Sequence, residues 1–143
     1  HWRVPPWDDL FARWRRARAT RSSDLRTVAD IALRRIRNLS AEDLAWFESS
    51  LEDADRRWVV TALYRNDPLP RRLFDPMMRA SLRDTDASDV QEFVRPCCET
   101  FGSGRVDAWL TRAAAAGLAD SEAITKARYK AAPTARKRGA RKS

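Results

Sequence analysis

Apolar residues recur along most of the chain at the spacing of amphipathic helices. Leu10, Phe11, Trp14 and Ala17 follow the i, i+3, i+4, i+7 pattern of one helical face. Between residues 24 and 39, apolar side chains cover more than half of the helix circumference, as expected for a helix packed between neighbours. The pattern predicts helices at 8–20, 24–39, 40–51, 55–65, 70–82, 88–101, 105–116 and 121–131. Because no stretch sustains the alternation typical of strands, the predicted fold class is all-α.

Residues with strong positional preferences mark where these helices begin and end. Ser40 and Asp43 have the spacing of a capping box, with Asp in place of the usual Glu. The prolines at positions 5 and 6 predict an extended opening before the first helix. Pro96 should kink or divide the helix at 88–101, because proline removes a backbone donor. Gly117 is placed to end the helix before it in the left-handed conformation.

A short motif recurs three times, each time after an apolar helical run. It reads Leu-Glu-Asp-Ala-Asp at 51–55, Leu-Arg-Asp-Thr-Asp at 82–86 and Leu-Ala-Asp-Ser-Glu at 118–122. An internal period of this length is typical of stacked-repeat proteins. We expect the Leu to be the last core-facing residue of a helix and the first acid to bond backbone N–H groups in the turn. The second acid should lie at or near the N-cap of the next helix.

A helix-end Leu, an acidic turn and a following helix whose apolar face contains Ala resemble the HEAT and HEAT-like (bilin-lyase type) repeats, over roughly 20–131. The chain departs from that pattern at the usual turn proline and at the following Val-Arg, where Trp58-Val59 stands. The resemblance implies antiparallel hairpins stacked as a short α-solenoid of about eight helices. The hairpins would be 24–39 with 40–51, 55–65 with 70–82, and 88–101 with 105–116. Residues 8–20 would cap one end and 121–131 would form a half-repeat; the alternative is a non-repetitive helical bundle with acidic N-caps.

The charge of the chain is concentrated at one end. Residues 126–143 carry eight Lys and Arg and no acid, whereas the 20 acids and the other 20 cations all lie in residues 1–125. The formal net charge of +8 therefore belongs to the last segment. With hardly an apolar anchor, this segment is expected to be a disordered basic tail. The predicted organisation is a HEAT-like repeat domain at 1–125 followed by the tail at 126–143.

Few residues in the sequence suggest catalysis. His1 is the only histidine, so histidine-dependent triads and histidine-bearing zinc sites are excluded. No phosphate-binding loop or dinucleotide fingerprint is present. Acid pairs such as Asp53 with Asp55 are better explained as helix caps than as cation ligands. The sequence predicts no enzyme activity, no cofactor, no metal and no small-molecule substrate.

The two cysteines and the tryptophans allow two more specific interpretations. Cys97 and Cys98 are adjacent, so they cannot easily bridge each other, and we interpret them as buried structural thiols in a reducing, intracellular compartment, the cytoplasm first. HEAT-like repeats also form alkylpurine DNA glycosylases, which use Trp, Asp and Arg. Trp58, Trp109 and Asp107 are of those types, but no local motif matches that family, so a glycosylase stays a remote third hypothesis.

Two functions remain, and no apolar run is long enough to suggest a membrane span. The first is a non-catalytic scaffold whose concave helix layer binds another protein through Arg56, Arg57 and Arg95. The second is a protein that binds the DNA or RNA backbone through the Arg-rich face of the first helix and through the tail. Trp14, within that face, would be either a base-stacking residue or a core anchor. The predicted nucleic-acid contacts are Arg13, Arg15, Arg16, Arg18, Lys126, Arg128, Lys130, Arg136, Lys137, Arg138, Arg141 and Lys142.

Overall fold

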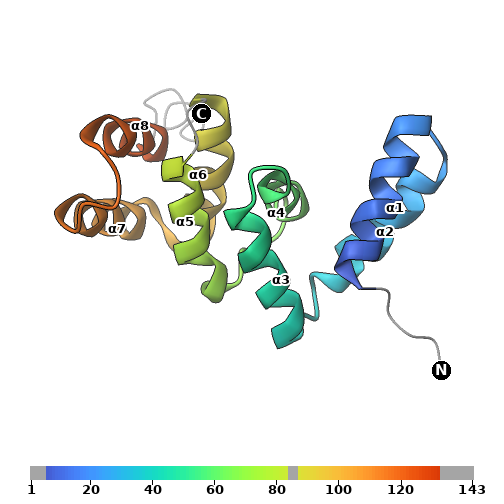
Figure 1. Cartoon of the computed structure of the whole chain (residues 1–143). Coiled ribbons are helices and arrows are strands. Elements are labelled where there is room, and N and C mark those ends of the chain that lie inside the picture. The colour runs from blue at the N-terminus through green and yellow to red at the C-terminus, as the bar shows by residue number, and fades with distance from the viewer. Residues whose placement is uncertain (1–5, 84–86, 133–143) are drawn as a thin grey trace, which may run out of the picture. The chain divides into compact units, whose positions relative to one another are not determined.

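The computed structural model describes residues 6–83 and 87–132, and this part of the chain is all-helical, as predicted (Figure 1). The helices are α1 (Trp7–Thr20), α2 (Asp24–Arg35), α3 (Ala41–Glu52), α4 (Arg57–Leu63), α5 (Phe74–Arg83), α6 (Ala87–Phe101), α7 (Ser103–Ala115) and α8 (Ser121–Ala131), with a 3₁₀ turn, η1 (Arg71–Leu73), before α5. The chain forms two compact units, His1–Ser49 and Ser50–Ser143, and α3 passes from the first to the second.

The first unit is built on a hairpin of α1 and α2. Instead of pairing with α3, as predicted, α2 packs chiefly against α1. Arg21 adopts the left-handed conformation at the end of α1, where Ser22 N–H donates to the Ala17 carbonyl. Trp7, at the first position of α1, is buried and stacks on Trp46 of α3 with 5.6 Å between ring centroids. Pro6, just before α1, is extended (φ −58°, ψ 151°), as predicted for the opening, and the rest of that opening lies outside the described residues.

The second unit is organised around α6. This helix packs against α5, α7 and α8 and less extensively against α4, and Figure 1 shows α5 alongside it. The predicted hairpin of 88–101 with 105–116 is confirmed by the packing of α6 on α7, whereas α4 packs mainly on α6 rather than on 70–82. Fully buried apolar side chains from five elements form the core, including Val60, Leu73, Met77, Met78, Val94 and Leu110. Since α8 packs on α5 and α6 as well as on α7, contacts in this unit are not restricted to sequence neighbours.

The three copies of the recurring motif lie in different surroundings. Leu51 is buried, Leu82 is half-buried and Leu118 is 46% exposed, so the expectation of a core-facing Leu is wrong at the third copy. Asp53 accepts a hydrogen bond from the backbone two residues on (2.8 Å), as expected of a turn acid. In the third copy the first acid, Asp120, is itself the N-cap and accepts from the N–H three residues on (2.8 Å). The acids at 84–86 lie outside the described residues, and the solenoid stays a prediction.

Glycine fixes two of the turns in the second unit, and a proline lies inside one of its helices. α6 runs undivided through Pro96, which leaves the Glu92 carbonyl without its usual intrahelical donor. Gly102, with φ +92°, is the single residue between α6 and α7, and a side chain there would be strained. Gly117 adopts φ +69° after α7, which confirms the predicted left-handed end.

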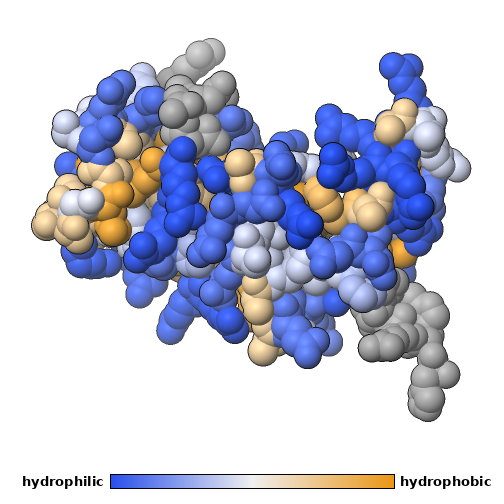
Figure 2. Space-filling view, viewed as in Figure 1, coloured by the Kyte–Doolittle hydropathy of each residue, from blue (hydrophilic) through white to orange (hydrophobic). Residues whose placement is uncertain are grey.

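The face of the second unit seen in Figure 2 is mostly hydrophilic. Apolar residues gather over α7 and the turn before α8, where Leu118 and three consecutive alanines, 114–116, are exposed. Within residues 6–83 and 87–132, every helix is too short or too polar to cross a bilayer.

Candidate binding pocket

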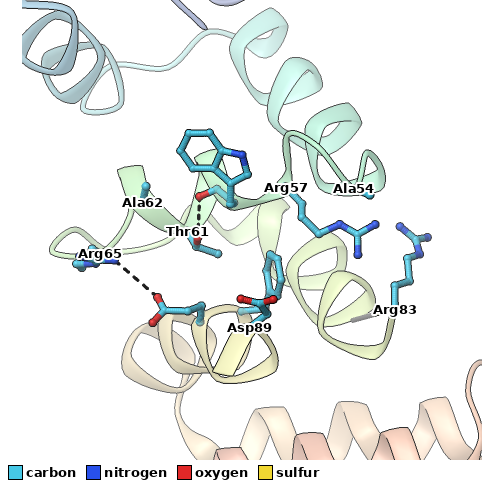
Figure 3. Close-up of a pocket in the computed structure, with 10 residues that line it drawn as sticks. Ala54, Arg57, Thr61, Ala62, Arg65, Arg83 and Asp89 are labelled. Atoms are coloured by element: carbon cyan, nitrogen blue, oxygen red, sulfur yellow. Dashed lines mark hydrogen bonds and ion pairs between the residues drawn. The ribbon is translucent and has the colours of Figure 1, made fainter. Parts of the chain in front are cut away.

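A pocket of about 640 Å³ lies between α4 and α6 in the second unit (Figure 3). Its α4 wall follows directly from the turn at Asp53. Trp58 Nε1 donates to the Asp55 carbonyl (2.8 Å), which fixes the indole against the turn, and Thr61 Oγ1 donates to the Trp58 carbonyl (2.7 Å). The described lining residues are Ala54, Arg57, Trp58, Thr61, Ala62, Arg65, Arg83, Asp89, Glu92 and Phe93.

Helical spacing accounts for the residues on each wall. Arg57 and Thr61 are four residues apart on α4 and therefore share a face. Asp89, Glu92 and Phe93 lie within one turn and a residue of each other on α6, so they too project from one side. Phe93 is 2% exposed and anchors that wall in the core. The pocket thus has an apolar base and charged edges.

The charges in the pocket are separated along its length. At one end Arg65 lies 4.0 Å from Glu92, and because both side chains are well exposed this pair is weak. At the other end Arg57 and Arg83 reach toward one another (Figure 3). Among the described residues, no carboxylate pairs with either of these two guanidinium groups. The Arg57 Nε is buried and has no hydrogen-bond acceptor among the described residues.

The three arginines predicted to bind a partner do not form one site. Arg57 lines the pocket between α4 and α6, together with Arg83, which the sequence analysis did not select. Arg95 lines a second pocket of about 490 Å³ with Asn66, Asp67 and Thr100, and its Nε donates to Glu99 (2.9 Å). Arg56 lies 3.8 Å from Asp53 and is not among the residues that line either pocket.

The Arg-rich face of α1 is partly engaged within the first unit. Arg13 forms a two-pronged ion pair with Asp24 of α2, and this bond holds the pKa of Asp24 below its usual value despite partial burial. Arg18 lies over the Trp14 ring, 5.1 Å from the centroid, and Arg15 similarly over Phe11. Arg16 is exposed. Trp14 is half-buried rather than a fully buried core anchor.

The described part of the predicted tail is helical, because α8 extends to Ala131. Lys126, Arg128 and Lys130 therefore lie on an ordered helix rather than in a disordered tail. Arg128 is engaged with α7: its Nε lies 3.0 Å from an Asp107 carboxylate oxygen and it donates to Thr111 (2.9 Å). The other predicted contacts, Arg136, Lys137, Arg138, Arg141 and Lys142, lie outside the described residues.

Among the described residues, the most buried carboxylate is that of Asp43, which belongs to the first unit and serves its packing. Asp43 accepts hydrogen bonds from Trp7 Nε1 (2.7 Å) and Arg35 (2.7 Å) and forms the predicted capping box with Ser40 (2.9 and 3.2 Å). Burial raises the pKa of Asp43, but the hydrogen bonds from Ser40, Trp7 and Arg35 outweigh it, so the pKa lies below its usual value. Every donor is a residue of the same unit, and the arrangement is explained by packing alone.

The remaining candidate groups do not come together as a catalytic or metal site. Cys97 is buried and Cys98 half-buried, and burial raises the pKa of both thiols. In residues 6–83 and 87–132, no three potential metal ligands gather. Of the glycosylase-type residues, Trp58 lines the pocket, whereas Trp109 is buried with its Nε1 bonded to Asp75 (2.9 Å) and Asp107 pairs with α8.

The pocket itself offers charge and hydrogen-bond donors rather than a nucleophile. Its described lining contains no cysteine or histidine, and its one hydroxyl, on Thr61, donates to a backbone carbonyl. Comparisons with protein-family models, with curated proteins and with solved structures give no match for this chain. The functional interpretation of the pocket therefore rests on its own side chains.

Proposed function

We propose that this chain is a non-catalytic helical interaction module that binds another protein. In this proposal an acidic side chain of the partner enters the end of the α4–α6 pocket marked by Arg57 and Arg83. The supporting observation is that these two guanidinium groups face each other without a carboxylate partner among the described residues. The Arg57 Nε is also buried and has no acceptor among the described residues, and an unsatisfied buried donor costs about 1–3 kcal/mol.

Two further features favour a protein segment over a nucleic-acid backbone. Trp58 and Phe93 line the same pocket, and aromatic residues beside arginine are typical of protein-interface hot spots. Asp89 and Glu92 on the α6 wall would repel a chain of regularly spaced phosphates. The pocket suits one anionic group followed by neutral or basic residues. The nucleic-acid hypothesis rests instead on the Arg-rich face of α1, on α8 and on residues 133–143, which lie outside the described part of the chain.

The stacked-hairpin scaffold stays a prediction, and the proposed site does not require it. Both walls of the pocket belong to the second unit, and α4 packs directly on α6. A partner segment could therefore bind whether or not the hairpins stack as a solenoid. The predicted roles of Arg56 and Arg95 are separate hypotheses, because neither residue lines this pocket.

Selection from a random peptide display library on the full chain would test the proposal. We expect the selected peptides to be enriched in Asp or Glu at one position. Their affinity, measured by fluorescence anisotropy, should fall at least about tenfold in the Arg57→Gln/Arg83→Gln variant, since losing a charge-assisted contact costs about 1.5–3 kcal/mol.

The matched control is the double variant Arg71→Gln/Arg105→Gln, which also removes two positive charges, but from exposed positions outside the pocket. Affinity should change less than about twofold in this control, provided that circular dichroism shows both variants folded. If both variants lose affinity equally, binding reflects net charge alone and the proposal is wrong. Selected peptides without an acidic position would also contradict it.

A further inference from the structure

We infer that the acidic group bound at the Arg57–Arg83 end of the pocket is a phosphate monoester on a partner side chain, such as phosphoserine. This inference rests on the proposed function and specifies the chemistry of the ligand. Its basis is the match between one compact dianion and two guanidinium groups that have no carboxylate partner among the described residues. A carboxylate, the other anionic group of ordinary proteins, matches this end of the pocket less well.

Charge is the first reason. Two juxtaposed guanidinium groups repel each other in the unliganded pocket, and a single carboxylate brings one negative charge against their two positive ones. A phosphomonoester carries about −1.5 to −2 at pH 7 and so neutralises both. Neither Arg57 nor Arg83 has a competing carboxylate in an ion pair within residues 6–83 and 87–132, so binding breaks no ion pair among those residues.

Hydrogen-bonding capacity is the second reason. Each guanidinium presents five N–H donors in a rigid fork that matches two oxygens at a time. A carboxylate has two oxygens with about four acceptor sites in one plane, and one bidentate fork occupies one acceptor site on each oxygen. A phosphomonoester has three terminal oxygens around one phosphorus, so it can accept from both forks at once.

The rest of the pocket limits the ligand to one phosphate. Asp89 and Glu92 lie on the α6 wall, and Arg65 at the far end is already 4.0 Å from Glu92. A second phosphate along the pocket would meet these carboxylates. Trp58 and Phe93 offer apolar surface for the residues next to the phosphorylated one. These features favour a phosphorylated protein segment over a polyphosphate or a nucleic-acid strand.

Oriented peptide libraries would test the inference on the full chain. Three libraries with the same randomised flanks carry serine, glutamate or phosphoserine at the central position. We expect the phosphoserine library to bind at least about tenfold more tightly than the glutamate library and the serine library to bind weakest. Arg57→Lys and, separately, Arg83→Lys keep the positive charge but lose the fork, and each should remove most of the phosphoserine advantage.

Matched controls separate the possible outcomes. Arg71→Lys lies outside the pocket and should leave all three affinities unchanged. Affinities of the glutamate and phosphoserine libraries within twofold of each other would overturn the inference. The proposed function would survive that result if binding still required Arg57 and Arg83. If glutamate and phosphoserine peptides bind but the glutamine double variant binds them normally, the proposed function fails as well.

Two added probes identify the source of the phosphate. Inorganic phosphate should displace the phosphoserine peptide at millimolar concentration, whereas chloride at equal ionic strength should not. The second probe is a single-stranded oligonucleotide. If it displaces the peptide at lower concentration than the unlabelled phosphopeptide does, and only when Arg57 and Arg83 are intact, the inference is overturned in favour of nucleic acid.

Discussion

Replacing Asp43 with alanine is the sharpest test of how the first unit is held together. The carboxylate is 4% exposed and joins three segments, because it bonds Trp7 of α1, Arg35 of α2 and the Ser40 N–H at the start of α3. The Arg35 guanidinium also lies over the Trp7 ring, 4.7 Å from its centroid. Removing the carboxylate therefore leaves several donors without acceptors at once.

The size of the effect follows from those donors. An indole N–H left buried without an acceptor costs about 1–3 kcal/mol, and loss of a helix N-terminal cap costs about 1 kcal/mol. The Arg35 side chain, 18% exposed, can recover part of its hydration, so its contribution is smaller than for a fully buried ion pair. These terms overlap, and we expect Asp43→Ala to lower the free energy of unfolding by about 3 kcal/mol.

Unfolding in guanidinium chloride, followed by tryptophan fluorescence and far-ultraviolet circular dichroism, measures this change in the free energy of unfolding. Asp30→Ala is the matched control, because Asp30 is an exposed acid on α2 and its replacement should shift stability by less than about 0.5 kcal/mol. A loss of less than about 1 kcal/mol in Asp43→Ala would refute the claim that this network stabilises the unit.

Three further predictions concern acid sensitivity, one buried hydrogen bond and the thiols. The folded-state pKa of Asp43 lies below its ordinary value of about 3.9, so its stabilising contribution is complete above that pH and is lost as the pH falls through the folded-state pKa. The stability difference between the wild type and Asp43→Asn should therefore shrink below about pH 4, and a difference that grows there would contradict the assignment. Trp109→Phe removes the indole N–H that donates to Asp75. It should lower the free energy of unfolding by about 1–2 kcal/mol, measured by thermal or chemical denaturation. An unchanged unfolding midpoint would show that the hydrogen bond contributes nothing to stability. Because burial raises the pKa of Cys97 and Cys98, a chromogenic disulfide reagent at pH 7.5 should label both at least about tenfold more slowly in the native protein than in guanidinium, and equal rates would contradict their burial.

Local features were predictable because local forces decide them. The capping box of Ser40 and Asp43 depends on residues three apart, and the left-handed Gly117 depends on one residue's conformational freedom. Neither needs knowledge of the rest of the fold. Of the two outcomes predicted at Pro96, a division of the helix did not occur and a kink stays a prediction; packing of α6 against four other helices favours a continuous helix despite the missing donor.

Packing partners were harder to predict, since they depend on surfaces far apart in the chain. The predicted pairing of each helix with a particular chain neighbour succeeded for α6 with α7. It failed for α2, which packs on the preceding helix, α1, rather than on the following helix, α3. Trp7 was missed for a similar reason: only tertiary contacts with Trp46 and Phe47 identify it as an anchor.

Of the two arginines at the proposed binding end of the pocket, the sequence identified one. Arg57 stood out because it begins a helix directly after an acidic turn. Arg83 lies in the second copy of that motif, a signal that could have marked it, but its position opposite Arg57 depends on where α5 ends relative to α4. Arg95 was grouped with Arg57 because both were expected in the concave helix layer, and the fold places Arg95 in a different pocket.

The most direct test of the central claim is a double-mutant cycle across the proposed interface. It combines Arg57→Gln in the chain with replacement of the acidic residue by its neutral counterpart in one selected peptide. If the guanidinium contacts that acid, the two changes should be coupled by at least about 1 kcal/mol in binding free energy. Changes that add independently, to within about 0.3 kcal/mol, would contradict the claim that Arg57 binds the partner's acidic group.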